Sequence, residues 1–193
     1  INAGTTSGNE LSLDQMLVLE QLVESFPGQH LISVKDEGTK IVEFYESSEE
    51  LKRLAVGDAD GLIATSDSSS LTPSELAVLL SVDGLDIPGS AFAVSGTSNQ
   101  ISNELTANGT VNLAQADSIA VTSSVLPLNV VEYEALGSLI TNKGTNVKVQ
   151  DAIGNVAVST ATSDLTGVSK VVGVVSGHGQ DITGLDGTQL DEI

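Results

Sequence analysis

The sequence predicts an α/β fold: a repeat solenoid with short parallel strands and short helices, about two coils per 57–60 residue repeat. Two patterns predict it, a helix-start pattern that recurs four times and an alternating strand pattern that follows the first three starts. Composition agrees, because 40% of the 193 residues are hydrophobic and only 3% are aromatic. A core of Val, Leu, Ile and Ala suits thin repeated layers.

Each repeat is expected to contain a capped helix. A helix-capping residue is followed three positions later by Glu or Gln, the spacing of a capping box, in which each side chain binds the other residue's backbone N–H. The four pairs are Ser12 and Gln15, Thr72 and Glu75, Asn129 and Glu132, and Asp186 and Gln189. The caps at 12, 72, 129 and 186 are 60, 57 and 57 residues apart. Four boxes at nearly constant spacing predict copies of one unit.

Apolar residues follow each cap at helical spacing. They stand four positions after the cap at Met16, Leu76, Tyr133 and Leu190, and seven positions after it at Leu19, Leu79, Leu136 and Ile193. Positions four and seven lie on one face of a helix, which predicts the buried face. Pro73 directly follows its cap, where a helix tolerates proline best.

Alternating strand patterns are found at 31–38, 91–98 and 146–152, each after one of the first three helices. Further β-rich segments at 61–70 and 118–125 precede the second and third caps. A second, weaker helix is expected from Lys40 and another from Asn99. The corresponding third segment, 155–172, is so rich in Val, Thr and Ser that we do not predict a helix there.

The repeats divide the chain into a partial repeat (1–30), two repeats (31–90 and 91–146) and a second partial repeat (147–193), expected to form one continuous solenoid. Ile1 stands just before a helix start and Ile193 stands at a core position, and neither end has an evident polar capping repeat. We therefore expect a segment of a longer repeat protein, covered at its ends by neighbouring repeats or by another molecule.

Charge and composition exclude several classes of function. The formal net charge of −19 argues against nucleic acid and against an anionic membrane surface, whereas it permits metal cations or a simple solvated acidic surface. There are no cysteines, so disulfides and zinc–thiolate sites are excluded. No apolar run approaches the roughly 18 residues of a membrane span, so membrane insertion is not expected.

The chain resembles the degenerate repeats of very large bacterial exoproteins. The segments that carry the resemblance are FAVSGTSNQISNEL, starting at Phe92, and DSIAVTSSVLPLNVVEYEAL, starting at Asp117. Similar repeats occur in S-layer-like proteins, giant adhesins and the repeat regions of type I-secreted proteins of the RTX class. The resemblance covers essentially the whole chain. It implies a structural or adhesive role outside the cell, often stabilised by calcium, and it implies no catalytic site.

Calcium is the one cofactor for which the sequence offers candidates. GHGQDITGLDG, which contains Asp181, partly matches a calcium-binding nonapeptide, although His178 replaces its second glycine. GDADG places Asp58 and Asp60 two residues apart, and Asp67 follows Gly61 by six residues, the spacing at which an EF-hand has Glu. Glycine turns with solvated acids are the favoured explanation of both segments.

Two further calcium candidates, Asp36 and Asp151, stand at matching strand ends. Carboxylates at the corners of successive coils can bind a cation, but Asp at a strand end can also form a turn by binding its own backbone. Both alternatives stay open at this point.

Catalytic motifs are not evident. His30 and His178 lack the HxH or HExxH spacing of a zinc site, and no GxSxG or phosphate-binding glycine loop is present. Two Tyr and three Phe provide a poor platform for a sugar. Asn108-Gly109-Thr110 is a formal glycosylation sequon, and it also fits a plain Asn-Gly turn. We do not expect an enzyme.

The sequence therefore predicts a structural extracellular repeat protein that forms a cell-surface layer, sheath or filament by self-association, which cations can bridge. Its partners would be copies of itself or neighbouring repeats of the same chain. The alternative is the stalk of a giant bacterial adhesin, which needs length and solubility but no self-association. Both alternatives place the protein outside the cell, at the bacterial surface.

Overall fold

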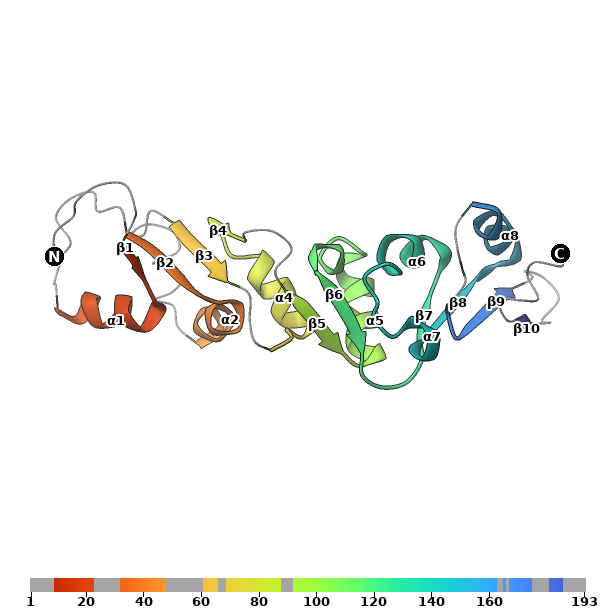
Figure 1. Ribbon diagram of the computed structural model, residues 1–193, viewed down its shortest axis with the longest axis horizontal. Helices are drawn as coiled ribbons and strands as arrows, with labels where there is room; N and C mark the ends of the chain where they lie inside the picture. The colour runs from red at the N-terminus through yellow and green to blue at the C-terminus, as the bar shows by residue number, and fades with distance from the viewer. Residues whose placement is uncertain are drawn as a thin grey trace. The chain divides into compact units, whose positions relative to one another are not determined.

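The computed structural model describes residues 9–22, 32–47, 61–65, 69–87, 92–162, 165, 167–174 and 181–185. The chain falls into two compact units, residues 1–71 with 75–92 and residues 72–74 with 93–193. Both units are built of short strands and short helices (Figure 1), so the predicted α/β class is confirmed.

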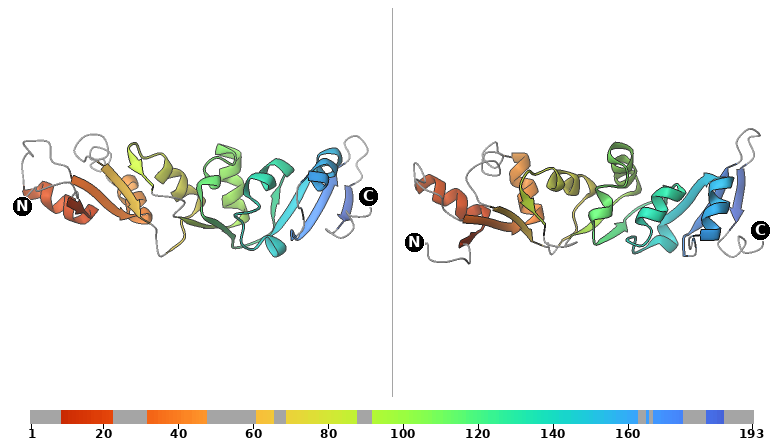
Figure 2. Two further views of the ribbon diagram at one scale, coloured as in Figure 1. Left: turned by 45° about the horizontal axis from the view of Figure 1, so that its top comes forward. Right: turned by 90° about the horizontal axis from the view of Figure 1, so that it is seen from above.

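The first unit contains one four-stranded sheet. Its elements are β1 (Asn9–Leu11), α1 (Leu13–Leu22), β2 (Ile32–Glu37), α2 (Gly38–Ser47), β3 (Gly61–Thr65) and β4 (Leu85–Asp86), with α4 (Pro73–Leu80) belonging to this unit from Glu75 onward. The strand order is β1-β2-β3-β4 and every neighbouring pair is parallel. Parallel neighbours need a crossover connection, and α1 and α2 lie on the first two of these connections (Figure 2).

The second unit contains two small sheets. Its elements are β5 (Ala93–Gly96), α5 (Ser98–Asn108), the 3-10 helix η1 (Leu113–Gln115), β6 (Ser118–Val121), β7 (Leu126–Leu128), α6 (Val130–Leu136), α7 (Lys143–Asn146), β8 (Val147–Ala152), α8 (Ile153–Thr162), β9 (Lys170–Val174) and β10 (Asp181–Leu185). One sheet pairs β5 with β6 in parallel, and the other has the order β10-β9-β8-β7. Strands β7, β8 and β9 are parallel, whereas β10 joins β9 antiparallel.

The three sheets share one arrangement of buried residues. A central pair of strands places Val34 beside Leu62 in the first sheet, Val94 beside Ile119 in the second and Val149 beside Val171 in the third. All six side chains are at most 6% exposed. Val34, Val94 and Val149 belong to the alternating segments read from the sequence, and the alternation places these three residues on the buried face of their sheets.

The helix pattern is confirmed at five of the predicted core positions and at two of the four predicted capping boxes, while the Thr72–Glu75 box stays a prediction. The residues four positions after the caps, Met16, Leu76 and Tyr133, are buried, as are Leu79 and Leu136. The capping boxes of Ser12 with Gln15 and of Asn129 with Glu132 form. The fourth box, Asp186 with Gln189, and the core positions Leu190 and Ile193 lie outside the described residues.

One segment goes beyond the sequence prediction. In the Val- and Thr-rich third segment, to which we assigned no helix, α8 forms. Its Val156 is buried, so packing outweighs the weak helix propensity of β-branched residues.

The strands that the structure describes form three separate small sheets. Short parallel strands with short helices are thus established, while their stacking into a solenoid stays a prediction. None of the described helices is both long and apolar enough to span a membrane.

Candidate functional site

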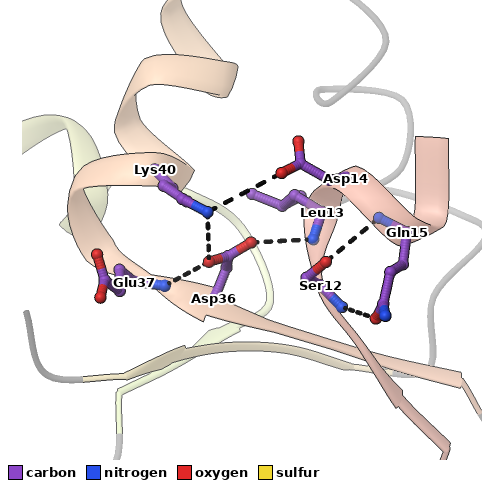
Figure 3. A network of polar contacts seen from close by, with 7 residues as sticks. All are labelled: Ser12, Leu13, Asp14, Gln15, Asp36, Glu37 and Lys40. Carbon is purple, nitrogen blue, oxygen red and sulfur yellow. Dashed lines mark hydrogen bonds and ion pairs between the residues drawn. The ribbon is translucent and has the colours of Figure 1, made fainter. Parts of the chain in front are cut away.

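The carboxylate of Asp36, at the end of β2, binds the first turn of α1 (Figure 3). Its Oδ2 accepts a hydrogen bond from the backbone N–H of Leu13 at 3.0 Å, and its Oδ1 accepts one from the backbone N–H of Glu37 at 2.9 Å. Leu13 is the first residue of α1, so its N–H has no partner within the helix. Asp36 therefore satisfies a helix-terminal donor from a strand 23 residues further along the chain.

The capping box completes the start of α1 (Figure 3). The backbone N–H of Gln15 donates to Ser12 Oγ at 3.2 Å, and the backbone N–H of Ser12 donates to Gln15 Oε1 at 3.0 Å. Together with Asp36, these contacts give partners to three backbone donors in the first turn. We call the contact between a strand-end Asp and the first N–H of a helix a carboxylate joint.

A second carboxylate joint connects β8 to α6. Asp151 Oδ2 accepts from the backbone N–H of Val130 at 3.1 Å, and Asp151 Oδ1 accepts from the backbone N–H of Ala152 at 2.7 Å. Val130 is the first residue of α6, whose start also carries the Asn129 capping box. Asn155 Nδ2 adds a bond to Asp151 Oδ1 at 2.9 Å. Asp36 and Asp151 thus make the same two backbone contacts in different compact units.

The side chain four residues after each Asp also contacts it. In the first joint this side chain is Lys40, whose Nζ lies 3.8 Å from Asp36 Oδ1 and 3.9 Å from Asp14 Oδ2. In the second joint it is Asn155, which donates a hydrogen bond to Asp151. Lys40 is half-exposed, so these ion pairs are worth at most about 1 kcal/mol. The Lys40 ammonium group is thus a cationic neighbour of both Asp36 and Asp14.

The pKa of Asp151 is lowered from its ordinary value. Burial acts in the opposite direction and raises this pKa, but the hydrogen bonds from Asn155, Val130 and Ala152 together lower it by more. Hydrogen bonds to the charged form of a carboxyl favour that form, so Asp151 is held as a carboxylate.

Between the two carboxylate joints in the sequence, the same place is occupied by Gly96 and Pro73. When the repeats are aligned, the strand-end position is occupied by Asp36, Gly96 and Asp151 in turn. The position directly after the cap is occupied by Leu13, Pro73 and Val130 in the same order. Pro73 has no N–H to donate, and Gly96 has no side chain to accept. We call this contact the proline joint.

The proline joint is closely packed. A Cβ atom placed on Gly96 would lie 2.9 Å from Pro73 Cδ and 3.0 Å from Pro73 Cγ. The proline ring therefore occupies the space that a side chain at position 96 would need. The polar contact of the carboxylate joints is replaced by an apolar contact that leaves no donor unsatisfied.

The neighbouring helix α5 starts with its own capping box. Gln100 N–H donates to Thr97 Oγ1 at 3.2 Å, and Thr97 N–H donates to Gln100 Oε1 at 2.9 Å. Gln100 stands where the carboxylate joints have Lys40 and Asn155, four residues after the strand-end position. Gly96 offers no carboxylate, and the side chain of Gln100 binds Thr97.

A buried carboxylate that sequence reasoning missed lies on α5. Glu104 is 7% exposed, and its Oε1 accepts from Asn108 Nδ2 at 2.9 Å and from Asn112 Nδ2 at 2.7 Å. The two amides hold the turn after α5, where Gly109 has a φ of 63°. The spacing of Glu104 and Asn108, four residues apart on a helix, is the signal that could have identified the pair. Asn108 of the glycosylation sequon is thus also part of this turn.

Asn142 closes the end of β6. Its Oδ1 accepts from the backbone N–H of Val121 at 3.1 Å, and its Nδ2 donates to the backbone oxygen of Val121 at 2.7 Å. Asn146 Nδ2 donates to the same oxygen at 2.7 Å. These side chains satisfy backbone groups at the edge of β6, as a further strand would.

Of the six candidate calcium ligands, only Asp36 and Asp151 have side chains that the structure describes. Asp58, Asp60 and Asp67 lie outside the described residues, and Asp181 belongs to β10 but its side chain is not described. Asp36 and Asp151 accept the hydrogen bonds given above. Across the described ranges, no three His, Cys, Asp or Glu side chains group closely enough to hold a metal ion. Calcium binding at these residues stays a prediction.

No protein-family model matches the chain, and neither a curated protein nor a solved structure matches it.

Proposed function

We propose that this chain is a structural repeat segment of an extracellular protein, and that it works as a stalk or spacer. The observation that carries the proposal is the recurrence of one joint at the starts of α1, α4 and α6, twice with Asp and once with Gly and Pro. The polar side chains at these places satisfy backbone groups. Contacts that fix each helix start to a strand end in successive repeats are expected in a protein whose role is structural.

The proposal includes the solenoid. Successive sheets would stack as coils of one rod, about two coils per repeat, with the joints holding each helix on its coil. Small-angle X-ray scattering on chains containing two, three and four repeats tests this arrangement. The maximum dimension should grow in proportion to the number of repeats, and a dimension that levels off would contradict the solenoid.

The strand edges favour a stalk over a self-associating layer. Strands β1 and β7 are the outermost strands of their sheets, and each has only three residues. Glu10 of β1 is paired with Lys35 at 3.1 Å, and the middle residue of β7 is the exposed Pro127. Short strands, charges and proline at an edge oppose pairing with another chain.

A layer or filament remains the second candidate because of the charge. With a net charge of −19, two copies repel each other unless cations lie between them. Calcium at the predicted acidic sites would supply those cations. Self-assembly that a chelator leaves unchanged would contradict this candidate.

Analytical ultracentrifugation with calcium and then with a chelator, followed by electron microscopy of the same samples, tests both candidates. A stalk should sediment as a monomer in both conditions and show single rods. Ordered sheets or filaments that dissolve in chelator would instead establish the layer and contradict the stalk.

A further inference from the structure

Asn108 belongs to the only Asn-Gly dipeptide in the sequence. Its side chain is exposed, and Gly109 has a φ of 63°. Apart from its chain neighbours, no atom in the described part of the chain lies within 4 Å of the position that a Cβ on Gly109 would take. A glycine nitrogen can approach the side chain of the preceding Asn more easily than any other residue's nitrogen, because glycine has no side chain in the way. Asn108 is therefore the position of this chain that is chemically most prone to deamidation.

Deamidation of Asn108 has two steps and needs only water as a co-reactant. In the first step the backbone nitrogen of Gly109 forms a bond to Asn108 Cγ, and the bond from Cγ to Nδ2 breaks. The proton of the attacking N–H passes to the leaving group, which departs as ammonia and leaves a succinimide ring. In the second step water opens the ring at either carbonyl, so the product is Asp or isoaspartate. Both products have an acceptor-only carboxylate where the amide had two donors.

Both reacting groups are engaged while the end of α5 is folded. The backbone N–H of Gly109 donates to the carbonyl oxygen of Leu105 at 2.9 Å, which closes the last turn of the helix. Asn108 Nδ2 donates to Glu104 Oε1 at 2.9 Å. The nitrogen that must attack is therefore used in the helix cap, and the amide that must leave is held by a buried carboxylate. Both contacts have to open before the succinimide can form.

The surroundings of Glu104 determine what the modification changes. Glu104 is 7% exposed, and its Oε1 accepts from the amides of Asn108 and Asn112. None of the ion pairs among the described residues includes Glu104. A carboxylate at position 108 removes one of the two amide donors and places a second negative charge beside the first. The closed turn between α5 and η1 is therefore unfavourable after deamidation.

We propose that Asn108 is a site of spontaneous modification. When the end of α5 opens, Asn108 deamidates to Asp or isoaspartate, and the new carboxylate beside Glu104 prevents the turn between α5 and η1 from closing again. The change is irreversible because the ammonia is lost. A long-lived chain would thus accumulate a loosened turn after α5, at a rate set by how often the helix end opens.

Asn103 provides an internal comparison on the same helix. It is exposed, as Asn108 is, but the residue that follows it is Glu104, whose side chain hinders the attack of the backbone nitrogen. Asn103 also lies in the interior of α5, whereas Asn108 is the last residue of this helix. Deamidation should therefore be found at Asn108 well before it is found at Asn103.

Prolonged incubation of the intact chain in mildly alkaline buffer, followed by peptide mass spectrometry and detection of isoaspartate, tests the reaction. Deamidation at Asn108 should proceed in the folded chain, but at least about tenfold more slowly than in the same chain unfolded in urea, because the folded helix end must first open. Equal rates in the two states would overturn the proposed protection. An Asn108 that stays intact in the unfolded chain would overturn the site itself.

Substitution of Glu104 tests whether this residue controls the reaction. Glu104→Leu releases the Asn108 amide, so deamidation of the folded variant should be at least about tenfold faster than that of the wild type. Glu104→Gln keeps an acceptor oxygen and is the matched control, with a rate closer to that of the wild type. An unchanged rate in Glu104→Leu contradicts the proposal. If Glu104→Leu does not fold, the comparison of folded and unfolded wild type decides.

Two further variants test the consequence of the modification by amide hydrogen exchange. Asn108→Asp reproduces one product, so the amides of residues 109–112 should exchange at least about tenfold faster than in the wild type. Asn103→Asp adds the same charge at an exposed residue of the same helix and should leave these amides as protected as they are in the wild type. Wild-type protection in Asn108→Asp, or equal loss of protection in both variants, would show that the carboxylate at position 108 does not open the turn.

Discussion

A Cβ atom on Gly96 would lie 2.9 Å from Cδ of Pro73, a distance that real Cβ atoms essentially never show. The proline ring at the start of α4 and the missing side chain at the end of β5 are therefore two halves of one contact. In the carboxylate joints the corresponding residues, Asp151 and Val130, form a hydrogen bond instead. The same place in the repeat is therefore filled in two ways. Where the helix starts with proline, the strand ends with glycine; where the helix starts with a residue that has an N–H, the strand ends with Asp.

Gly96→Ala should destabilise the chain by about 1–3 kcal/mol, because the new methyl group overlaps the proline ring and the packed joint must shift. Urea unfolding followed by circular dichroism measures the change. Gly154→Ala is the matched control: apart from its chain neighbours and the backbone of its own helix, no atom lies within 4 Å of its Cβ, and Ala favours the helix, so this variant should be neutral or slightly more stable. A Gly96→Ala variant as stable as Gly154→Ala would show that the ring is free to move.

Converting the proline joint into a carboxylate joint gives a stronger test. Pro73→Val restores an N–H without an acceptor and should cost about 1–3 kcal/mol, while Gly96→Asp places a carboxylate against the proline ring. The double variant can form a carboxylate joint, so its loss should be smaller than the sum of the two single losses by about 1–2 kcal/mol. The same unfolding experiment on all four chains completes the double-mutant cycle. Additive losses would contradict the equivalence of the joints.

Removing the cap of α6 tests the predicted capping boxes. Asn129→Ala deletes the acceptor for the Glu132 N–H and should destabilise the chain by about 1 kcal/mol. Asn129→Ser keeps an oxygen at the cap and should recover most of that loss. Thermal unfolding distinguishes the two variants, and equal melting temperatures for Ala and Ser would indicate that Asp151 alone fixes the start of α6.

The buried Glu104 should be required for its acceptor and not for its charge. Glu104→Leu removes the acceptor of both Asn108 and Asn112 and should cost about 1–3 kcal/mol, with faster amide exchange at residues 109–112. Glu104→Gln keeps one acceptor oxygen of the same shape and should remain closer to the wild type. If Glu104→Gln destabilises the chain as much as Glu104→Leu does, the charge of Glu104 is itself required.

Local patterns in the sequence predicted much of the fold. The boxes at Ser12 and Asn129 and the buried Met16 and Tyr133 follow from three- and four-residue spacings, which are short-range properties. The burial of Val34 follows from alternation along one strand. In each case one segment contains all the information.

The joints could not be found this way because their partners are far apart in the sequence. Asp36 and Leu13 are 23 residues apart, and Asp151 and Val130 are 21 apart. Strand-end position had suggested a cation ligand or a turn former for both Asp residues, and each does bind the N–H that follows it. The signal that was available is the alignment of the repeats, in which the one Pro after a cap coincides with the one Gly at the strand end.

The edge strand β7 offers a direct test of the stalk against the layer. Pro127, the middle residue of β7, is exposed, lies in register with Lys148 of β8 and has no N–H to offer a further strand. Pro127→Val supplies an N–H and a residue that favours strands, so the variant should associate through this edge at concentrations where the wild type is monomeric. Sedimentation velocity over a hundredfold range of concentration measures it, and Pro127→Lys, which restores the N–H but adds a charge at the edge, is the matched control. If the Pro127→Val variant associates while the wild type and the Pro127→Lys variant stay monomeric, the proline keeps β7 from pairing with another chain, as a stalk requires. A wild type that already associates at low concentration in chelator would contradict the stalk.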